Sequence, residues 1–222
     1  MRVGVLVILA MFLISTAWAE DLGSPITGEA KTAFLTGWSE HLRNMRSLHM
    51  LFRQEKHVRV LRQALVAQGE LWLKGDTLLY VLKNPAGETE LIVRLDKQMV
   101  QTYYTLLNTL EVVNLQTTGA FPQVLPFWYP EPDALARDYE VDLFLDAAGL
   151  HTLRLVPKDT RVSVQEIRLM LSDFQPQAFE QVEKNGTRMH MQITTFTMNA
   201  EVSEAQLELH VPAGTKVVHP LK

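Results

Sequence analysis

Residues 69–85, GELWLKGDTLLYVLKNP, decide the fold of this chain. Apolar residues recur at every second position in two runs, first at Leu71 and Leu73 and then at Leu79 and Val81. Between the runs, residues 74–77 (KGDT) are of the types that form turns. Period-two alternation gives each strand one apolar and one solvated face, so the stretch predicts a β-hairpin.

The same alternation recurs along most of the chain. Further runs of strand length lie at 48–54, 90–95, 99–104, 141–145, 150–157, 164–174, 178–183, 189–198 and 207–211. Short turn sequences separate them, among them Asn185-Gly186, which is typical of a type I′ hairpin. About ten short strands without alternating helices indicate a mainly β fold built on one antiparallel sheet, curled or closed.

One segment before the strands has helical periodicity. Apolar residues follow one another at intervals of four, four and three, at Phe34, Trp38, Leu42 and Met45. This spacing predicts an amphipathic helix over 29–45 that lays one face on the sheet.

A second segment, 108–138, interrupts the strand pattern. Its prolines at 122, 126, 130 and 132 exclude a central strand and favour short helices and loops. The segment also contains large apolar residues, notably Phe121, Leu125, Phe127 and Trp128. Exposing so many apolar groups would be unfavourable, so we expect this segment to lie over an apolar surface as a lid.

Residues 1–19 have the plan of a secretory signal peptide. Arg2 supplies a positive start, an apolar run covers 3–14, and Ala17-Trp18-Ala19 is a small-x-small cleavage site. The run is short for a bilayer span, although a retained N-terminal anchor is the alternative. We expect cleavage after Ala19, export of the mature protein, and a single domain over 20–222.

Composition excludes several functional classes. The chain has 21 Lys and Arg against 25 Asp and Glu, a net charge of −4, which does not suit a nucleic-acid partner. It has no cysteine, so disulfides, thiolate chemistry and lipid attachment through cysteine are excluded.

The sequence contains no pattern typical of a catalytic site. Its seven histidines are scattered, and no HExxH, GxSxG or phosphate-binding glycine motif is present. The nearest carboxylate pairs, Glu88/Glu90 and Asp142/Asp146, are typical of solvated strand faces. We therefore expect no enzyme activity, no metal and no cofactor.

The apolar faces of the strands supply the candidate site. Methionine suits a surface that receives flexible alkyl chains, although any one of these methionines could be ordinary core filler. The expected cavity-lining residues are Met50, Phe52, Leu71, Leu73, Leu79, Val81, Leu143, Leu145, Leu153, Leu155, Ile167, Leu169, Met189 and Met191.

Three motifs in order resemble the LolA family of periplasmic outer-membrane lipoprotein carriers. Residues 48–54 (LHMLFRQ) resemble the family's S-F-x-A-x-F-x-Q strand, and 69–74 (GELWLK) are similar to its G-x-L-W-x-K strand. Residues 207–217 (LELHVPAGTKV) resemble its F-x-F-x-x-P-x-G-x-x-V terminus. The resemblance implies an unclosed antiparallel β-barrel of ten to eleven strands, with an N-terminal helix and a helical or loop lid over a hydrophobic concave face.

One position departs from the family pattern. In the family, an Arg that holds the lid closed follows the G-x-L-W-x-K strand, whereas this chain has Gly75 there. Because Gly75 has the same parity as Leu71 and Leu73, we expect a cavity-facing hydrogen-bond donor to be missing. A lid without this donor should open more readily.

The resemblance implies a monomeric carrier in the periplasm that binds lipoprotein acyl chains or another lipid and moves them from the inner to the outer membrane. Its partners would be an inner-membrane donor and an outer-membrane acceptor. The alternative is a binding module of the same fold that senses lipid or lipidated protein without transporting it.

Overall fold

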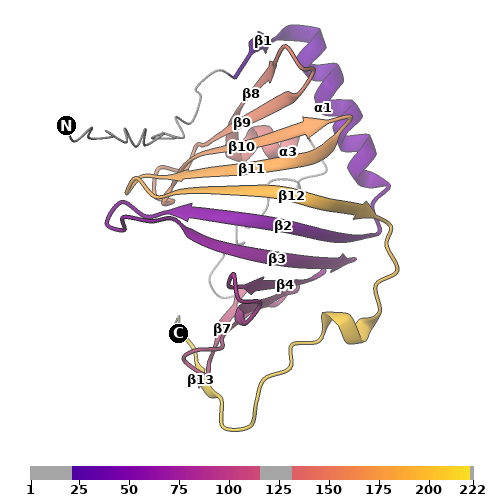
Figure 1. Ribbon diagram of the computed structural model, residues 1–222. Coiled ribbons are helices and arrows are strands. Elements are labelled where there is room, and N and C mark those ends of the chain that lie inside the picture. Colours follow the sequence, from indigo (N-terminus) through magenta and orange to yellow (C-terminus); the bar gives the residue numbers. More distant parts are fainter. Residues whose placement is uncertain (1–21, 116–131, 221–222) are drawn as a thin grey trace, which may run out of the picture.

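The computed structural model describes residues 22–115 and 132–220, and these form one 13-stranded sheet with helices beside it (Figure 1). The first strands are β1 (Ser24–Ile26), β2 (Ser47–His57), β3 (Leu65–Lys74), β4 (Thr77–Lys83), β5 (Thr89–Leu95), β6 (Met99–Tyr104) and β7 (Thr109–Asn114). The others are β8 (Tyr139–Leu145), β9 (His151–Pro157), β10 (Val164–Ser172), β11 (Gln175–Glu183), β12 (Arg188–Met198) and β13 (Lys216–Val218). The helices are α1 (Gly28–Arg43), α3 (Pro132–Asp138) and the 3₁₀ helix η2 (Glu204–Leu207).

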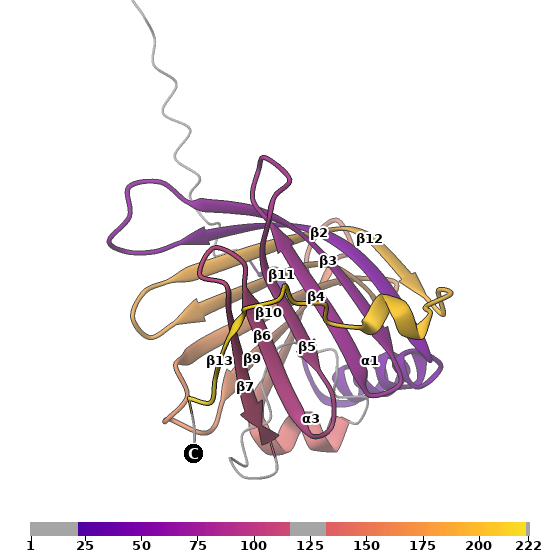
Figure 2. The same ribbon diagram turned by 90° about the horizontal axis from the view of Figure 1, so that it is seen from below.

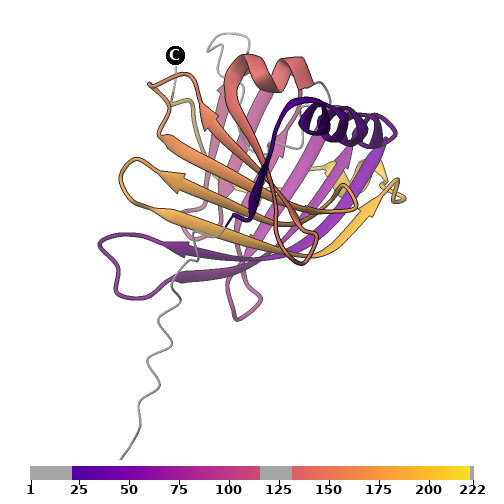
Figure 3. The same ribbon diagram turned by 90° about the horizontal axis from the view of Figure 1, so that it is seen from above.

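The sheet is open, which confirms the unclosed barrel. Its strands follow the order β1-β8-β9-β10-β11-β12-β2-β3-β4-β5-β6-β7-β13, so β1 and β13 form its two edges. Neighbouring strands are antiparallel except at β7–β13, which is parallel. In Figure 3 the sheet curls around α1 and α3, which lie on its concave side.

The structure has more strands than the sequence pattern predicts. The short edge strands β1 and β13 have too few residues to show an alternation. The sequence pattern places β7 in the proline-broken segment, but the strand ends at Asn114, before the first proline of that segment at Pro122.

The prediction for the C-terminal segment was wrong in its detail. Residues 207–211 form no strand: Leu207 is the last residue of η2, where the Ser203 hydroxyl accepts a hydrogen bond from the Gln206 amide at 3.3 Å, and residues 208–211 pair with no described strand. The chain then crosses the outside of β4–β6 before β13 pairs with β7 (Figure 2). Leu207 is buried, so its apolar character reflects packing on the sheet rather than a strand of its own.

The hairpin at Asn185-Gly186 exists, but its turn is of another type. The Glu183 amide donates to the Thr187 carbonyl at 2.8 Å, which leaves a three-residue loop in which Gly186 has φ +85°. A type I′ turn would need a positive φ at Asn185 as well. A three-residue loop that ends in a left-handed glycine is the next commonest hairpin connection, and the same Asn-Gly sequence suits it.

Candidate functional site

One face of the sheet, here called the inner face, is apolar across strands β8–β12, β2 and β3. Buried side chains there form one cluster with residues of α1 and α3. Ten of the predicted lining residues belong to it: Met50, Phe52, Leu71, Leu73, Leu143, Leu153, Leu155, Ile167, Leu169 and Met191. Met189 is partly buried and packs against the cluster.

The strand register explains why this face is continuous. Side chains directly opposite each other on neighbouring antiparallel strands point to the same face. Pairing therefore aligns one unbroken apolar row from β8 to β12, made of Leu143, Leu153, Leu169, Phe179 and Met191. A flexible alkyl chain can lie along this row of side chains.

Two predicted lining residues lie on the opposite, outer face. Leu79 pairs with Trp72, and Leu79 and Val81 pack with Val202 and Leu207 of the C-terminal segment. The prediction was wrong because β4 is apolar at adjacent positions, so alternation alone cannot assign its faces. The register of β3 with β4 assigns them, and it turns Leu78, Tyr80 and Leu82 inward instead.

Leu145 lies at the last position of β8, on the same face as Leu143 but only partly buried. The predicted lid residues Phe121, Leu125, Phe127 and Trp128 lie outside the described residues.

Helices α1 and α3 cover part of the inner face. Trp38 and Leu42 of α1 and Leu135 of α3 are buried in the cluster. The predicted spacing of four residues between Trp38 and Leu42 therefore does place a helix face on the sheet. The Lys31 ammonium group also donates to the Val141 carbonyl, which ties α1 to β8.

The β10–β11 turn, which the sequence pattern did not predict, packs against α1. Asp173 and Phe174 form the two-residue β10–β11 turn, and both have positive φ, at 48° and 64°. A bulky side chain rarely adopts this conformation, which costs on the order of 1–2 kcal/mol. The Phe174 ring packs 5.2 Å from that of Phe34 and also touches α1 at Gly37, so contacts with the helix offset the strain. Only the three-dimensional contacts reveal this, because Phe is not a turn residue.

A polar pair interrupts the apolar inner face. The Tyr80 hydroxyl donates to the Gln54 side-chain oxygen at 3.2 Å, and the Tyr80 ring stacks on Phe52 at 5.3 Å. Burial raises the pKa of Tyr80 far above its ordinary value, so the hydroxyl stays neutral. The pair offers one fixed polar contact within a greasy surface.

Helix α1 also holds buried polar atoms that no described residue satisfies. They are Nε1 of Trp38, Oγ of Ser39 and Nε2 of His41. Ser39 lines a pocket of about 390 Å³ between α1 and α3, together with Thr32, Thr36, Arg43 and Asp133. Buried polar groups are usually paired, so three buried polar atoms without a hydrogen-bond partner among the described residues on one helix are unusual.

Glycine 69 is required by the packing of the inner face. A Cβ added there would lie 1.9 Å from the Phe52 ring, so the ring occupies the space that a side chain would need. Gly69 and Phe52 are cross-strand partners. The glycine in the GELWLK motif is thus explained by the aromatic residue in the strand beside it.

Gly75 does not face the inner side. It lies in the two-residue β3–β4 turn with φ +57°, beyond the end of β3 at Lys74. A Cβ there would meet no atom within 4 Å, and the Gly75 amide donates to the Arg46 carbonyl at 3.2 Å. The parity argument fails because the strand ends one residue earlier.

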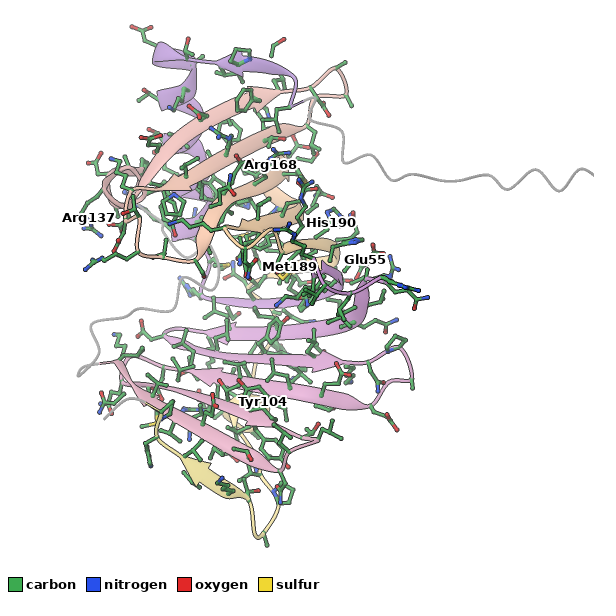
Figure 4. All side chains as sticks on the ribbon, turned by 90° about the vertical axis from the view of Figure 1, so that its left-hand side faces the viewer. Glu55, Tyr104, Arg137, Arg168, Met189 and His190 are labelled. Atoms are coloured by element: carbon green, nitrogen blue, oxygen red, sulfur yellow. The ribbon has the colours of Figure 1, made fainter. Side chains whose placement is uncertain are left out.

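Charged residues form a row across the outer face of β8–β12 and β2. Arg154 and Arg168 are cross-strand neighbours, and Glu166 accepts hydrogen bonds from both, at 2.8 and 2.5 Å. Burial disfavours the charged form of Glu166, but the two arginines outweigh it and hold its pKa below the ordinary value. Figure 4 labels Arg168, His190 and Glu55 along this row. The network is typical of a stabilising strand face.

Within 22–115 and 132–220, no group of three or more His, Asp or Glu residues is placed to hold a metal ion. No helix in the same ranges is both long and apolar enough to cross a bilayer.

A family model described as "Outer membrane lipoprotein carrier protein LolA" matches residues 43–209. No curated protein matches the sequence.

Several solved structures resemble the chain at low identity. An uncharacterized conserved protein from Thermus thermophilus has 14% identity and a TM-score of 0.51, over 85% of this chain and 99% of that one, and so shares the fold. A LolA superfamily protein from Nitrosomonas europaea has 10% identity and a TM-score of 0.43, over 80% and 97% of the two chains. A chain of the Pseudomonas aeruginosa MucA/MucB complex has 16% identity and a TM-score of 0.41, over 80% of this chain and 61% of that one.

Proposed function

Because the chain belongs to the LolA family, we propose that it is a periplasmic carrier for the acyl chains of lipoproteins or for another lipid. It takes its cargo from an inner-membrane donor, holds it against the inner face, and releases it to an outer-membrane acceptor. The observation that supports this most strongly is the unbroken apolar row from Leu143 to Met191, on a curled sheet that α1 and α3 partly cover.

The energy of binding is a difference between two sets of contacts. Burying a 16-carbon chain is worth roughly 12 kcal/mol as an upper bound, at about 0.8 kcal/mol per methylene. The inner-face side chains are already buried against Trp38, Leu42 and Leu135, so the cargo exchanges those contacts for its own. The net gain is therefore much smaller than the upper bound, which suits a carrier that must also release its cargo.

The polar atoms of α1 suit the other end of such a cargo. Acyl chains are joined to the rest of a lipid or lipoprotein through ester or amide groups, whose carbonyl oxygens accept hydrogen bonds. The indole Nε1–H of Trp38 and the hydroxyl of Ser39 can donate to such carbonyl groups. We infer that the alkyl chain lies on the sheet and that its carbonyl end lies near α1.

Native mass spectrometry of the mature protein, purified from periplasm without detergent, tests the proposal. The expected result is a species heavier than the chain by the mass of an acylated molecule. That molecule should pass to acceptor vesicles or to an acceptor protein on incubation. A mass equal to the bare chain in every preparation contradicts the proposal, and a stable complex with one protein and no lipid transfer supports a sensing module instead.

Paired variants locate the cargo. Leu71→Glu places a carboxylate on the inner face, whereas Val81→Glu places one on the outer face of the neighbouring strand. A charge without a partner is costly beside an alkyl chain, so binding of an apolar fluorescent probe should fall sharply in the first variant alone. Circular dichroism of both variants checks that the fold survives. Equal binding in the two variants contradicts a site on the inner face.

A further inference from the structure

The β2–β3 connection differs in charge from the rest of the chain. Residues 56–65 (KHVRVLRQAL), here called the basic–apolar loop, contain Lys56, Arg59 and Arg62 and no acidic residue. The chain as a whole has a net charge of −4. The loop is therefore positively charged within a chain of negative net charge. Arg59 and Arg62 are both exposed.

The same loop exposes large apolar side chains at its tip. Val60 is 85% exposed and Leu61 is 47% exposed, and the Leu61 amide donates to the Val58 carbonyl at 2.9 Å. The turn is thus held by a hydrogen bond while its apolar groups point into solvent. In Figure 1 the loop projects beyond the neighbouring hairpins at the left end of the sheet. Adjacent exposed apolar groups on a projecting loop indicate contact with another surface.

The loop has basic turns on one side and the β4–β5 turn, which contains Glu88, on the other. Because the strands are antiparallel, the β9–β10 and β11–β12 turns lie at the same end of the sheet as the β2–β3 loop. The Lys184 amide donates to the Ser163 carbonyl at 2.9 Å, and Arg59 reaches within 3.8 Å of the side-chain position at Gly186. Figure 4 views the sheet from this end. Four further basic residues, Lys158, Arg161, Lys184 and Arg188, outnumber the acidic residues of these turns, Asp159 and Glu183.

We propose that the basic–apolar loop docks the protein on an anionic lipid surface. Val60 and Leu61 enter the boundary between headgroups and acyl chains, and Arg59 and Arg62 bind headgroup phosphates from above. Basic residues beside projecting apolar ones are the combination that binds such an interface. The proposal goes beyond lipid carriage, since it concerns the membrane surface to which the protein binds and not the lipid that it carries.

Sedimentation of the mature protein with vesicles tests this inference. Vesicles of phosphatidylcholine alone are compared with vesicles of phosphatidylcholine and phosphatidylglycerol in equal amounts, at low and at physiological salt. Binding should require phosphatidylglycerol and should weaken as salt rises. In Arg59→Gln/Arg62→Gln, affinity should fall about thirtyfold, since each basic residue near an anionic surface contributes about fivefold.

A second variant separates insertion from charge. Val60→Ser/Leu61→Ser keeps every charge and should weaken binding on the order of tenfold or more by removing apolar area. The matched controls are Lys97→Gln, in the β5–β6 turn at the other end of the sheet, and Val211→Ser, and both should bind as the unaltered protein does. Since the loop is exposed, all variants should keep the unaltered melting temperature. Equal binding to both vesicle types, unchanged binding in both loop variants, or no vesicle binding at all overturns the proposal, and the last result leaves an acidic protein as the partner.

Discussion

Replacing Gly69 by Ala tests how tightly the inner face is packed. On backbone grounds alone the change should stabilise the protein by about 0.5–1 kcal/mol, because glycine loses more freedom on folding than alanine. The new Cβ would however lie 1.9, 2.2 and 2.6 Å from three atoms of the Phe52 ring. Phe52 is buried and stacked on Tyr80, so its ring cannot move aside freely.

The steric effect should therefore outweigh the backbone effect. Overpacking a filled core costs about 1–3 kcal/mol, which leaves a net destabilisation of about 1–2 kcal/mol. In a chain of this size the melting temperature should fall by about 2–8 °C. Thermal and urea unfolding followed by circular dichroism measure both quantities.

A double-mutant cycle with Phe52→Ala identifies the cause. Phe52→Ala alone should cost about 3–5 kcal/mol, but in its background Gly69→Ala should be neutral or stabilising because the ring is gone. The coupling energy should be about 1–3 kcal/mol. If Gly69→Ala costs the same in both backgrounds, or stabilises the protein when Phe52 is present, the reasoning from the ring contact is wrong.

Three further predictions follow from the turns and the outer face. Glu166→Gln leaves Arg154 and Arg168 facing each other and should cost about 1–3 kcal/mol at pH 7. Because folding lowers the pKa of Glu166, its contribution to the free energy of unfolding is fully present above about pH 4.5. This contribution is lost as the pH falls through the folded-state pKa. Urea unfolding should therefore give similar stabilities for the unaltered protein and Glu166→Gln in acid. Phe174→Gly removes both the strain of a positive φ at Phe and the contact of the ring with α1. Uptake of an apolar probe, measured by stopped flow, should therefore accelerate while the melting temperature changes little. Unchanged uptake would show that this turn does not restrain α1. Gly75→Arg and Gly75→Ala should share the same backbone cost and the same uptake rate, since the side chain meets open space, and slower uptake in the Arg variant alone would show a contact with the covering segment.

The sequence predicted the sheet because most strands have one apolar and one polar face. Leu71 and Leu73 alternate with polar or amphipathic neighbours, so their inward direction can be read directly. Strand β4 reads Thr-Leu-Leu-Tyr-Val-Leu-Lys, in which both faces are apolar, and the faces of Leu79 and Val81 depended on a register that alternation does not contain. The apolar outer face is explained by the C-terminal segment that covers it.

Parts of the site depend on contacts between segments far apart in the chain. Phe174 contacts α1 from a turn conformation that phenylalanine disfavours, so the sequence around residue 174 does not predict this contact. Gly75 was misplaced because one residue decided whether it continued the strand or began the turn. Residues 74–77 were predicted as a turn, which favours glycine at its first central position, so the parity of Leu71 and Leu73 should not have been extended to Gly75.

The central claim, that an acyl chain lies against the inner face, is tested most directly by photocrosslinking with a fatty acid that carries a diazirine in its alkyl chain. The unaltered mature protein is illuminated with this probe, digested, and mapped by mass spectrometry. The account predicts crosslinks on inner-face residues of several strands, such as Met50, Leu169 and Met191, and their loss when unlabelled fatty acid competes. Crosslinks confined to the outer-face cluster of Leu79 and Val202, or no competable crosslinks at all, would contradict it.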